Sequence, residues 1–167
     1  MTVLLQHTHY VFATSAPYSH APAAVRLSVG LVTLDSSIRV SIIIHANNTP
    51  AAEKIMTSAP QARDRIRLWI VGSKGALKDH ARAYKEMVFK SGRMYEQILQ
   101  VRGGANGEES GSDVDAQDTT WAAPSVYIFD ITAFWHVQSK AAVEAKFPHL
   151  ARSRLVGYSP VPLSDMI

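Results

Sequence analysis

Two guanidinium groups and an indole recur at every second position of the segment RIRLWIVGSK, residues 65–74. Arg65, Arg67 and Trp69 alternate there with aliphatic residues. A guanidinium group presents a planar set of donors that matches phosphate oxygens, and an indole is a platform on which a base can stack. The spacing therefore predicts a surface that binds single-stranded RNA or DNA. The alternative is an ordinary solvated strand face, with Trp69 covered by a neighbouring element or by a partner protein.

Further basic side chains extend this predicted surface. Arg63 lies just upstream, and the preceding predicted strand contributes Arg39 and His45 to the same face. The complete predicted nucleic-acid site consists of Arg39, His45, Arg63, Arg65, Arg67 and Trp69.

Signatures of catalysis and of metal binding are missing from the sequence. The chain has no cysteine, which excludes thiolate zinc sites and disulfides, and it has neither a Walker A sequence nor a G-x-S-x-G elbow. His7 and His9 could chelate a metal from one strand, but no third ligand follows at a recognisable spacing. His45 and His136 are each more typical of a hydrogen-bonded structural histidine. We therefore expect no metal, no cofactor and no enzymatic activity.

The elements that would position the basic surface are predicted from periodicity. Residues 65–72 alternate as a half-buried β-strand does. Alternation and β-branched runs predict four more strands, at 24–34, 38–47, 93–101 and 124–130. Helical spacing predicts helices over 76–90, ended by Gly92, and over 132–146. This order is that of the five-stranded Greek-key barrel called the OB-fold. We expect a mainly β protein, with a helix between strands 3 and 4 and an extra C-terminal helix.

The length of 167 residues suits a single domain with appended segments. The predicted parts are a flexible N-terminal segment 1–23, an OB-fold domain 24–131, and a C-terminal helix and tail 132–167. Residues 104–120 hold five of the 14 acidic residues and no basic one, and their composition predicts a mobile acidic loop. The rest of the chain is therefore more basic than its net charge of +3 suggests, which favours polyanionic partners.

Residues 65–101 resemble the centre of bacterial-type single-stranded-DNA-binding proteins. In that family a basic apolar strand ends in a glycine, here Gly72, and a helix ends in a Lys-Gly turn, here Lys90-Ser91-Gly92. The resemblance covers roughly residues 24–130 and implies an OB-fold that binds single strands and assembles into oligomers. The stacking aromatics of the family are largely missing. In its general character the chain also resembles the OB-fold interaction proteins of the kinetoplastid mitochondrial RNA-editing complex.

Together these features predict a non-catalytic protein that binds single-stranded nucleic acid, with RNA slightly preferred over DNA. It would act as a subunit of a larger homo- or hetero-oligomer. Two alternatives stay open: a structural protein–protein interaction subunit with little nucleic-acid contact, and a small enzyme with an unrecognised site. No stretch approaches the roughly 18 apolar residues of a membrane span. We expect an intracellular location and no membrane association. Mitochondria are a candidate location because the first 25 residues contain no acidic residue.

Overall fold

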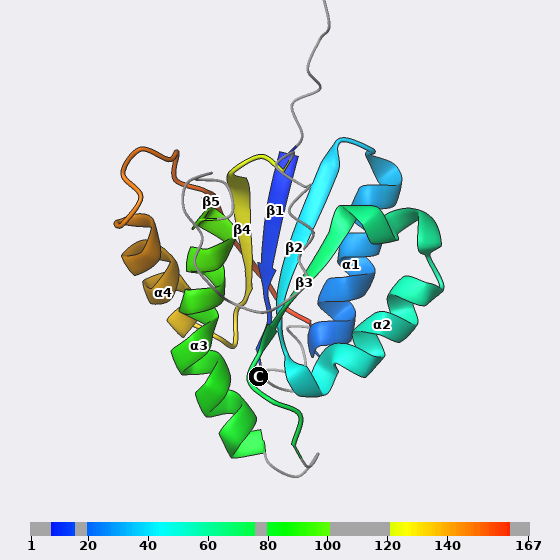
Figure 1. Cartoon of the computed structure of the whole chain (residues 1–167), viewed down its shortest axis with the longest axis horizontal. Coiled ribbons are helices and arrows are strands. Elements are labelled where there is room, and N and C mark those ends of the chain that lie inside the picture. The colour runs from blue at the N-terminus through cyan, green and yellow to red at the C-terminus, as the bar shows by residue number, and fades with distance from the viewer. Residues whose placement is uncertain (1–7, 16–19, 76–79, 101–120, 161–167) are drawn as a thin grey trace, which may run out of the picture.

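A sheet of five parallel strands forms the centre of the molecule (Figure 1). The computed structural model describes residues 8–15, 20–75, 80–100 and 121–160. The strand order is β3-β2-β1-β4-β5. The strands are β1 (Thr8–Ala13), β2 (Ile38–His45), β3 (Ile66–Val71), β4 (Pro124–Asp130) and β5 (Arg154–Tyr158). All five run downward in Figure 1, so their carboxyl ends meet at the lower edge of the sheet.

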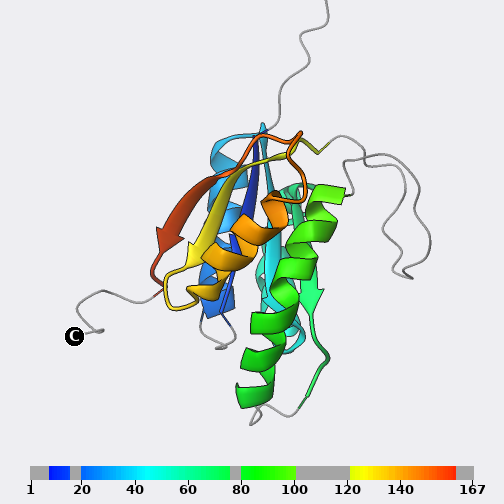
Figure 2. The ribbon, with the colours of Figure 1, turned by 90° about the vertical axis from the view of Figure 1, so that its left-hand side faces the viewer.

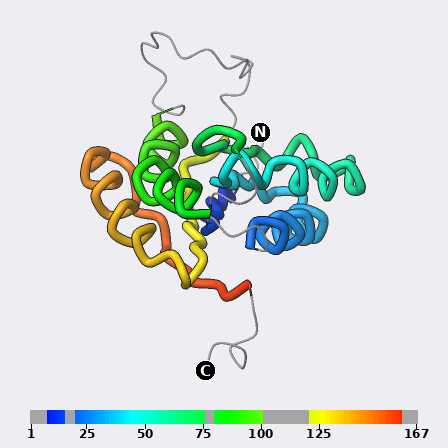
Figure 3. Tube along the Cα trace, turned by 90° about the horizontal axis from the view of Figure 1, so that it is seen from below, coloured from blue at the N-terminus to red at the C-terminus, as the bar shows by residue number. Residues whose placement is uncertain are grey.

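Helices cover both faces of the sheet, as parallel strands require. Within the described residues the α-helices are α1 (His20–Leu34), α2 (Thr49–Thr57), α3 (His80–Gln100) and α4 (Trp135–Glu144). Two 3₁₀ turns, Ala46–Asn48 and Pro60–Arg65, flank α2. Helices α1 and α2 lie on one face and α3 and α4 on the other (Figure 3). The fold is therefore a three-layer, Rossmann-like α/β arrangement.

The predicted OB-fold barrel is wrong, because the sheet is open and all its strand pairs are parallel. Residues 24–34, expected as a strand, belong to α1, and residues 93–100 continue α3. The segment 1–23, expected to be flexible, contains β1, which is the central strand. The C-terminal segment 132–167, predicted as a helix and a tail, also contains β5. The resemblance to single-stranded-DNA-binding proteins also implied an OB-fold, and the open parallel sheet contradicts that expectation as well. The predicted acidic loop 104–120 lies outside the described residues.

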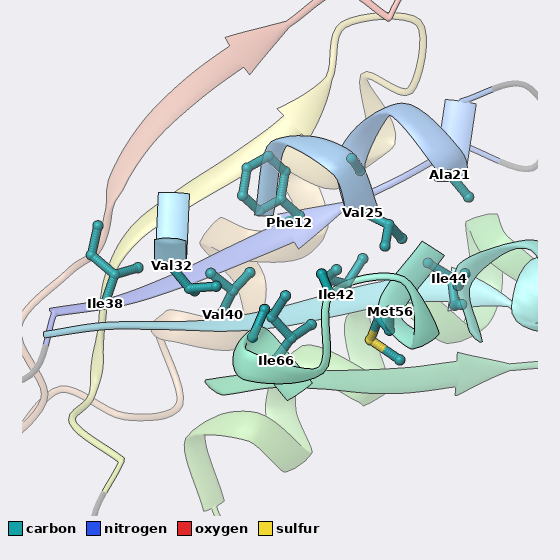
Figure 4. Close-up of a cluster of buried hydrophobic side chains, with 14 residues drawn as sticks. Phe12, Ala21, Val25, Val32, Ile38, Val40, Ile42, Ile44, Met56 and Ile66 are labelled. Carbon is teal, nitrogen blue, oxygen red and sulfur yellow. The ribbon is translucent and has the colours of Figure 1, made fainter. Parts of the chain in front are cut away.

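A first hydrophobic cluster fills the space between the sheet and helices α1 and α2 (Figure 4). Alternate residues of β2 point into it, and Phe12 enters from β1. Helix α1 contributes side chains that recur every three or four residues, namely Ala21, Ala24, Val25, Ser28 and Val32. This helical spacing outweighs the alternation that suggests a strand, since burial of one face of the helix supplies most of its stability.

A second cluster lies between the sheet and helices α3 and α4. Its largest fully buried side chains are Tyr95 and Tyr127, followed by Ile43 and Met87. The two helices lie side by side in front of the sheet in Figure 2. Gly92 falls inside α3 and is not a C-cap, contrary to the prediction. A Cβ atom at Gly92 would lie 3.4 Å from Cβ of Ser139, so this glycine lets α4 approach closely. None of the described helices has the length and hydrophobicity that crossing a membrane requires.

Candidate active site

The most informative position of the sheet lies between the carboxyl ends of β1 and β4. In open parallel sheets ligands bind where connections from neighbouring strands leave to opposite faces. Helix α1 follows β1 on one face, and α4 follows β4 on the other (Figure 3). Ser15 comes two residues after β1, and Asp130 is the last residue of β4. Polar side chains therefore stand where the fold predicts a ligand.

His20, the first residue of α1, joins these two residues in a buried cluster. Its Nδ1 atom lies 2.5 Å from Oδ2 of Asp130. The Ser15 hydroxyl donates to the same carboxylate oxygen at 2.6 Å, and Oγ of Ser15 lies 2.7 Å from Nδ1. The Asp130 side chain is fully buried, whereas that of His20 is 11% exposed. We call these residues the Ser15–His20–Asp130 cluster.

Asp130 is held in its ionised form by the groups around it. Thr132 donates to Oδ1 through its hydroxyl at 2.6 Å and through its backbone N–H at 2.9 Å. Burial alone would raise the pKa of Asp130. The hydrogen bonds from Ser15, Thr132 and His20 outweigh burial and hold the pKa below its ordinary value. The carboxylate is therefore a fixed negative charge at neutral pH.

An ionised Asp130 decides which nitrogen of His20 can act on a ligand. The carboxylate accepts the proton of Nδ1, so the neutral ring keeps its lone pair on Nε2. No residue in the described part of the chain hydrogen-bonds to Nε2. In hydrolases with a Ser-His-Asp triad the serine bonds to Nε2, whereas Ser15 lies on the Nδ1 side. Ser15 therefore orients the pair, and His20 is placed to act as a general base.

A second buried histidine supports the end of β1. His136 donates from Nε2 to the carbonyl of Thr14 at 3.0 Å. Burial lowers the pKa of His136 to about 4, although the bond to Thr14 and the charge of Asp130 oppose this shift. His136 is therefore neutral near pH 7, and it is a hydrogen-bonded structural histidine, as the sequence predicts.

Exposed aromatic rings lie along the same edge of the sheet. Phe134, in the turn between β4 and α4, is 72% exposed, and Tyr84 near the start of α3 is 47% exposed. Tyr84 meets Trp135 edge to face, with ring centroids 4.9 Å apart. The carboxyl edge thus combines a histidine base with apolar ring surface.

The predicted strip on β3 forms contacts within the chain. The Arg65 guanidinium donates to the carbonyls of Val32, Asp35 and Gln61. The guanidinium carbon of Arg67 lies 4.2 Å from the ring centroid of Trp121. The indole N–H of Trp69 donates to Oγ of Ser41 at 3.0 Å. On the alternate side of this edge strand Leu68 is only half-buried and Ile70 is 47% exposed. The half-buried strand predicted for residues 65–72 would place both aliphatic side chains in the core, but β3 lies at the edge of the sheet and leaves them partly exposed.

The other three predicted residues lie at separate places. Arg39 donates to the carbonyl of Ser36 at 3.0 Å. Arg63 pairs with Glu53 at 3.6 Å near α2. His45 bonds to Glu86 of α3 at 2.8 Å. This bond is the largest influence that lowers the pKa of Glu86, to about 2. The structure thus divides the six residues between the two helical layers, and nucleic-acid binding by them stays a prediction.

None of the three members of the Ser15–His20–Asp130 cluster was predicted from the sequence. A signal was present, because Ser15 closes the apolar run YVFATS and Asp130 closes VYIFD. Polar residues that follow apolar parallel strands meet at one edge, but that inference needs the correct fold. No protein-family model matches the chain, and comparison with curated proteins gives no significant match. Among the described residues, no group of three or more His, Asp or Glu side chains could hold a metal ion.

Proposed function

We propose that the chain is an enzyme that transfers a group from an activated donor to a hydroxyl group of an acceptor. The Ser15–His20–Asp130 cluster carries this proposal. It lies at the switch point of the sheet, which is the place between β1 and β4 where their connections leave to opposite faces. A histidine whose Nδ1 proton is fixed by a buried carboxylate, and whose Nε2 has no hydrogen-bond partner among the described residues, is suited to accept a proton from a hydroxyl.

The reaction needs one proton transfer and one displacement. Nε2 of His20 takes the hydroxyl proton as the acceptor oxygen forms its bond to the electrophilic carbon of the donor. The leaving group departs with the electron pair of the broken bond. Asp130 stabilises the imidazolium that results, as a buried carboxylate beside Nδ1 does in other histidine bases.

The donor class follows from what the cluster lacks. Within the described part of the chain, no second acid and no cationic side chain bonds to His20 or Asp130. A leaving group that departs as a stable anion, without being protonated, fits this arrangement. A nucleoside diphosphate does so, and by analogy of fold Rossmann-like sheets bind nucleotides at this edge. A nucleotide-activated sugar combines such a leaving group with a carbon electrophile.

The acceptor class is inferred from ring surface at the same edge of the sheet, on the side that α3 and α4 cover. Phe134 and Tyr84 expose aromatic rings at the same edge. Aromatic side chains favour offset or edge-to-face contact with another ring. A phenol offers both a ring for these contacts and a hydroxyl for His20, so we propose a phenolic acceptor.

The test uses 4-nitrophenol as acceptor with a panel of uridine and guanosine nucleotide sugars, and detects the product by mass spectrometry. His20→Ala and Asp130→Asn should each lower the rate by about 10²–10⁴-fold, the usual contribution of a general base. His149→Ala, which removes an exposed histidine, should leave the rate unchanged. Transfer by His20→Ala at the wild-type rate would refute the base. Release of free sugar at the same rate without the phenol would indicate a hydrolase.

The remaining expectations need other experiments. Binding of single-stranded RNA or DNA, and assembly with other subunits, stay predictions that retention on oligonucleotide columns and native mass spectrometry would check. We keep an intracellular location, with mitochondria as a candidate, as a proposal supported by the absence of cysteine and the acid-free first 25 residues. Cell fractionation tests it.

A further inference from the structure

Buried polar atoms without partners gather at the carboxyl edge of the sheet. Among the described residues, these atoms are Nδ2 and Oδ1 of Asn48, Oγ1 of Thr49, Oγ of Ser91, Nε1 of Trp135 and Oη of Tyr158. Only Ser91, in the middle of α3, lies away from that edge. A buried group left unpaired costs about 1–3 kcal/mol, and folded proteins pair the large majority of such groups. This concentration suggests that some of the missing partners belong to a ligand.

Tyr158 is the member of this set that lies in a strand of the sheet, beside the strand that carries Asp130. It is the last residue of β5 and pairs in register with Asp130 of β4. Side chains paired in register point to the same face, and this is the face of α1, since Asp130 contacts His20. The Tyr158 ring packs edge to face with Phe12, with centroids 6.0 Å apart. Its side chain therefore lies in the layer that contains the Ser15–His20–Asp130 cluster.

The pKa of the Tyr158 phenol determines whether its hydroxyl can serve as a hydrogen-bond donor near neutral pH. Burial raises the pKa of this phenol, and the negative charge of Asp130 raises it further. The hydroxyl therefore keeps its proton and can donate a hydrogen bond, but it does not act as a base.

We propose that the Tyr158 hydroxyl donates a hydrogen bond to the hydroxyl oxygen of the acceptor bound at His20. Tyr158 is thus a positioning residue, and the ligand class is a phenol or alcohol whose oxygen meets both side chains. This inference deepens the proposed function and rests on it. The hydrogen bond exists only in the complex, which explains why the hydroxyl has no partner among the described residues.

The first measurement is the stability of the full chain without ligand. Tyr158→Phe removes only the hydroxyl. Ser91→Ala is the matched control, because it removes an unpaired hydroxyl that lies away from the carboxyl edge. Both variants should unfold at the same urea concentration as the wild type or at a higher one, because neither hydroxyl has a partner to lose. A lower midpoint for Tyr158→Phe would show that the hydroxyl is already paired within the protein, and it would overturn the proposal.

The second measurement is the affinity for 4-nitrophenol, by calorimetry. Tyr158→Phe should weaken binding about fivefold, the effect of one neutral hydrogen bond, and Ser91→Ala should leave it unchanged. Nitrobenzene, which lacks the hydroxyl, should bind equally to the wild type and to Tyr158→Phe. Equal affinity of both proteins for 4-nitrophenol, or equal weakening for both ligands, would refute the role of Tyr158 while leaving His20 as the base. A wild-type protein that does not bind 4-nitrophenol would overturn both proposals.

Discussion

Replacing Asp130 tests the Ser15–His20–Asp130 cluster without knowledge of the substrate. The carboxylate accepts hydrogen bonds from four donors: the Ser15 hydroxyl, the ring N–H of His20, and the hydroxyl and backbone N–H of Thr132. Its side chain is fully buried. Each donor would be left without its partner by Asp130→Ala.

The size of the effect follows from these contacts. Removing one partner of a buried, hydrogen-bonded charge pair costs about 3–5 kcal/mol, which we expect for Asp130→Ala. Asp130→Asn keeps the shape, and its carbonyl can still accept from Thr132. Its NH₂ group would face the donors of Ser15 and His20, so we expect a loss of about 1.5–3 kcal/mol, the value of hydrogen bonds to a charged group.

The effect should also depend on pH in a defined direction. The pKa of Asp130 in the folded state lies below its ordinary value of 3.8. The stabilisation is therefore complete above that value and is lost as the pH falls through the folded pKa. The difference in unfolding free energy between wild type and Asp130→Asn should therefore shrink as the pH falls below about pH 4.

Urea unfolding followed by tryptophan fluorescence at a series of pH values measures this difference. Asp64→Asn, which alters an exposed carboxylate, is the control and should change stability by less than about 0.5 kcal/mol. If Asp130→Asn matches the wild type at pH 7, or if the gap stays the same at pH 3, Asp130 is not the buried ionised partner of His20.

Two further pairs of variants test the fold by thermal unfolding. Gly30→Ala should stabilise the protein by up to about 1 kcal/mol, because Gly30 lies within α1 with open space around its Cα. Gly72→Ala should destabilise it by more than about 1 kcal/mol, because Gly72 has a φ of +74° and its added Cβ would collide with the Glu86 carboxylate. A reversed order would contradict the turn after β3. Met87→Ala should cost about 2–5 kcal/mol, since Met87 is fully buried. Phe89→Ala, in the same helix but 80% exposed, should cost less than about 0.5 kcal/mol, and similar losses for both would contradict the orientation of α3.

Local patterns predicted those elements whose periodicity admits a single interpretation. The β-branched run that forms β2, and the apolar stretch that forms β4, lie where the sequence indicated. Helix α4 lies within the predicted range. Helix α1 was misassigned because Val25, Leu27, Val29 and Leu31 alternate, yet Leu27 is 50% exposed in the folded protein. The positions that pack on the sheet follow the helical period instead, and tertiary packing decides between the two patterns.

The candidate site depended on topology more than on local pattern. His20 and Asp130 lie 110 residues apart in the sequence, and they meet only because β1 and β4 are neighbours in the sheet. Once 24–34 was assigned to a strand and 1–23 to a flexible segment, β1 had no place in the prediction. The switch point could not then be located, although Asp130 was correctly placed at the end of a strand.

The position of β1 also has a consequence for how the polypeptide is made. On one side β1 pairs with β2, about thirty residues later, as Val11 does with Ser41. On the other side it pairs with β4, where Val11 meets Tyr127. While the ribosome is still synthesising the intervening chain, one edge of the central strand has no neighbour. An open apolar edge is a template for aggregation, and such long-range parallel pairing forms slowly. The nascent protein should therefore depend on chaperones until β4 emerges, and the contact between His20 and Asp130 should be among the last to form.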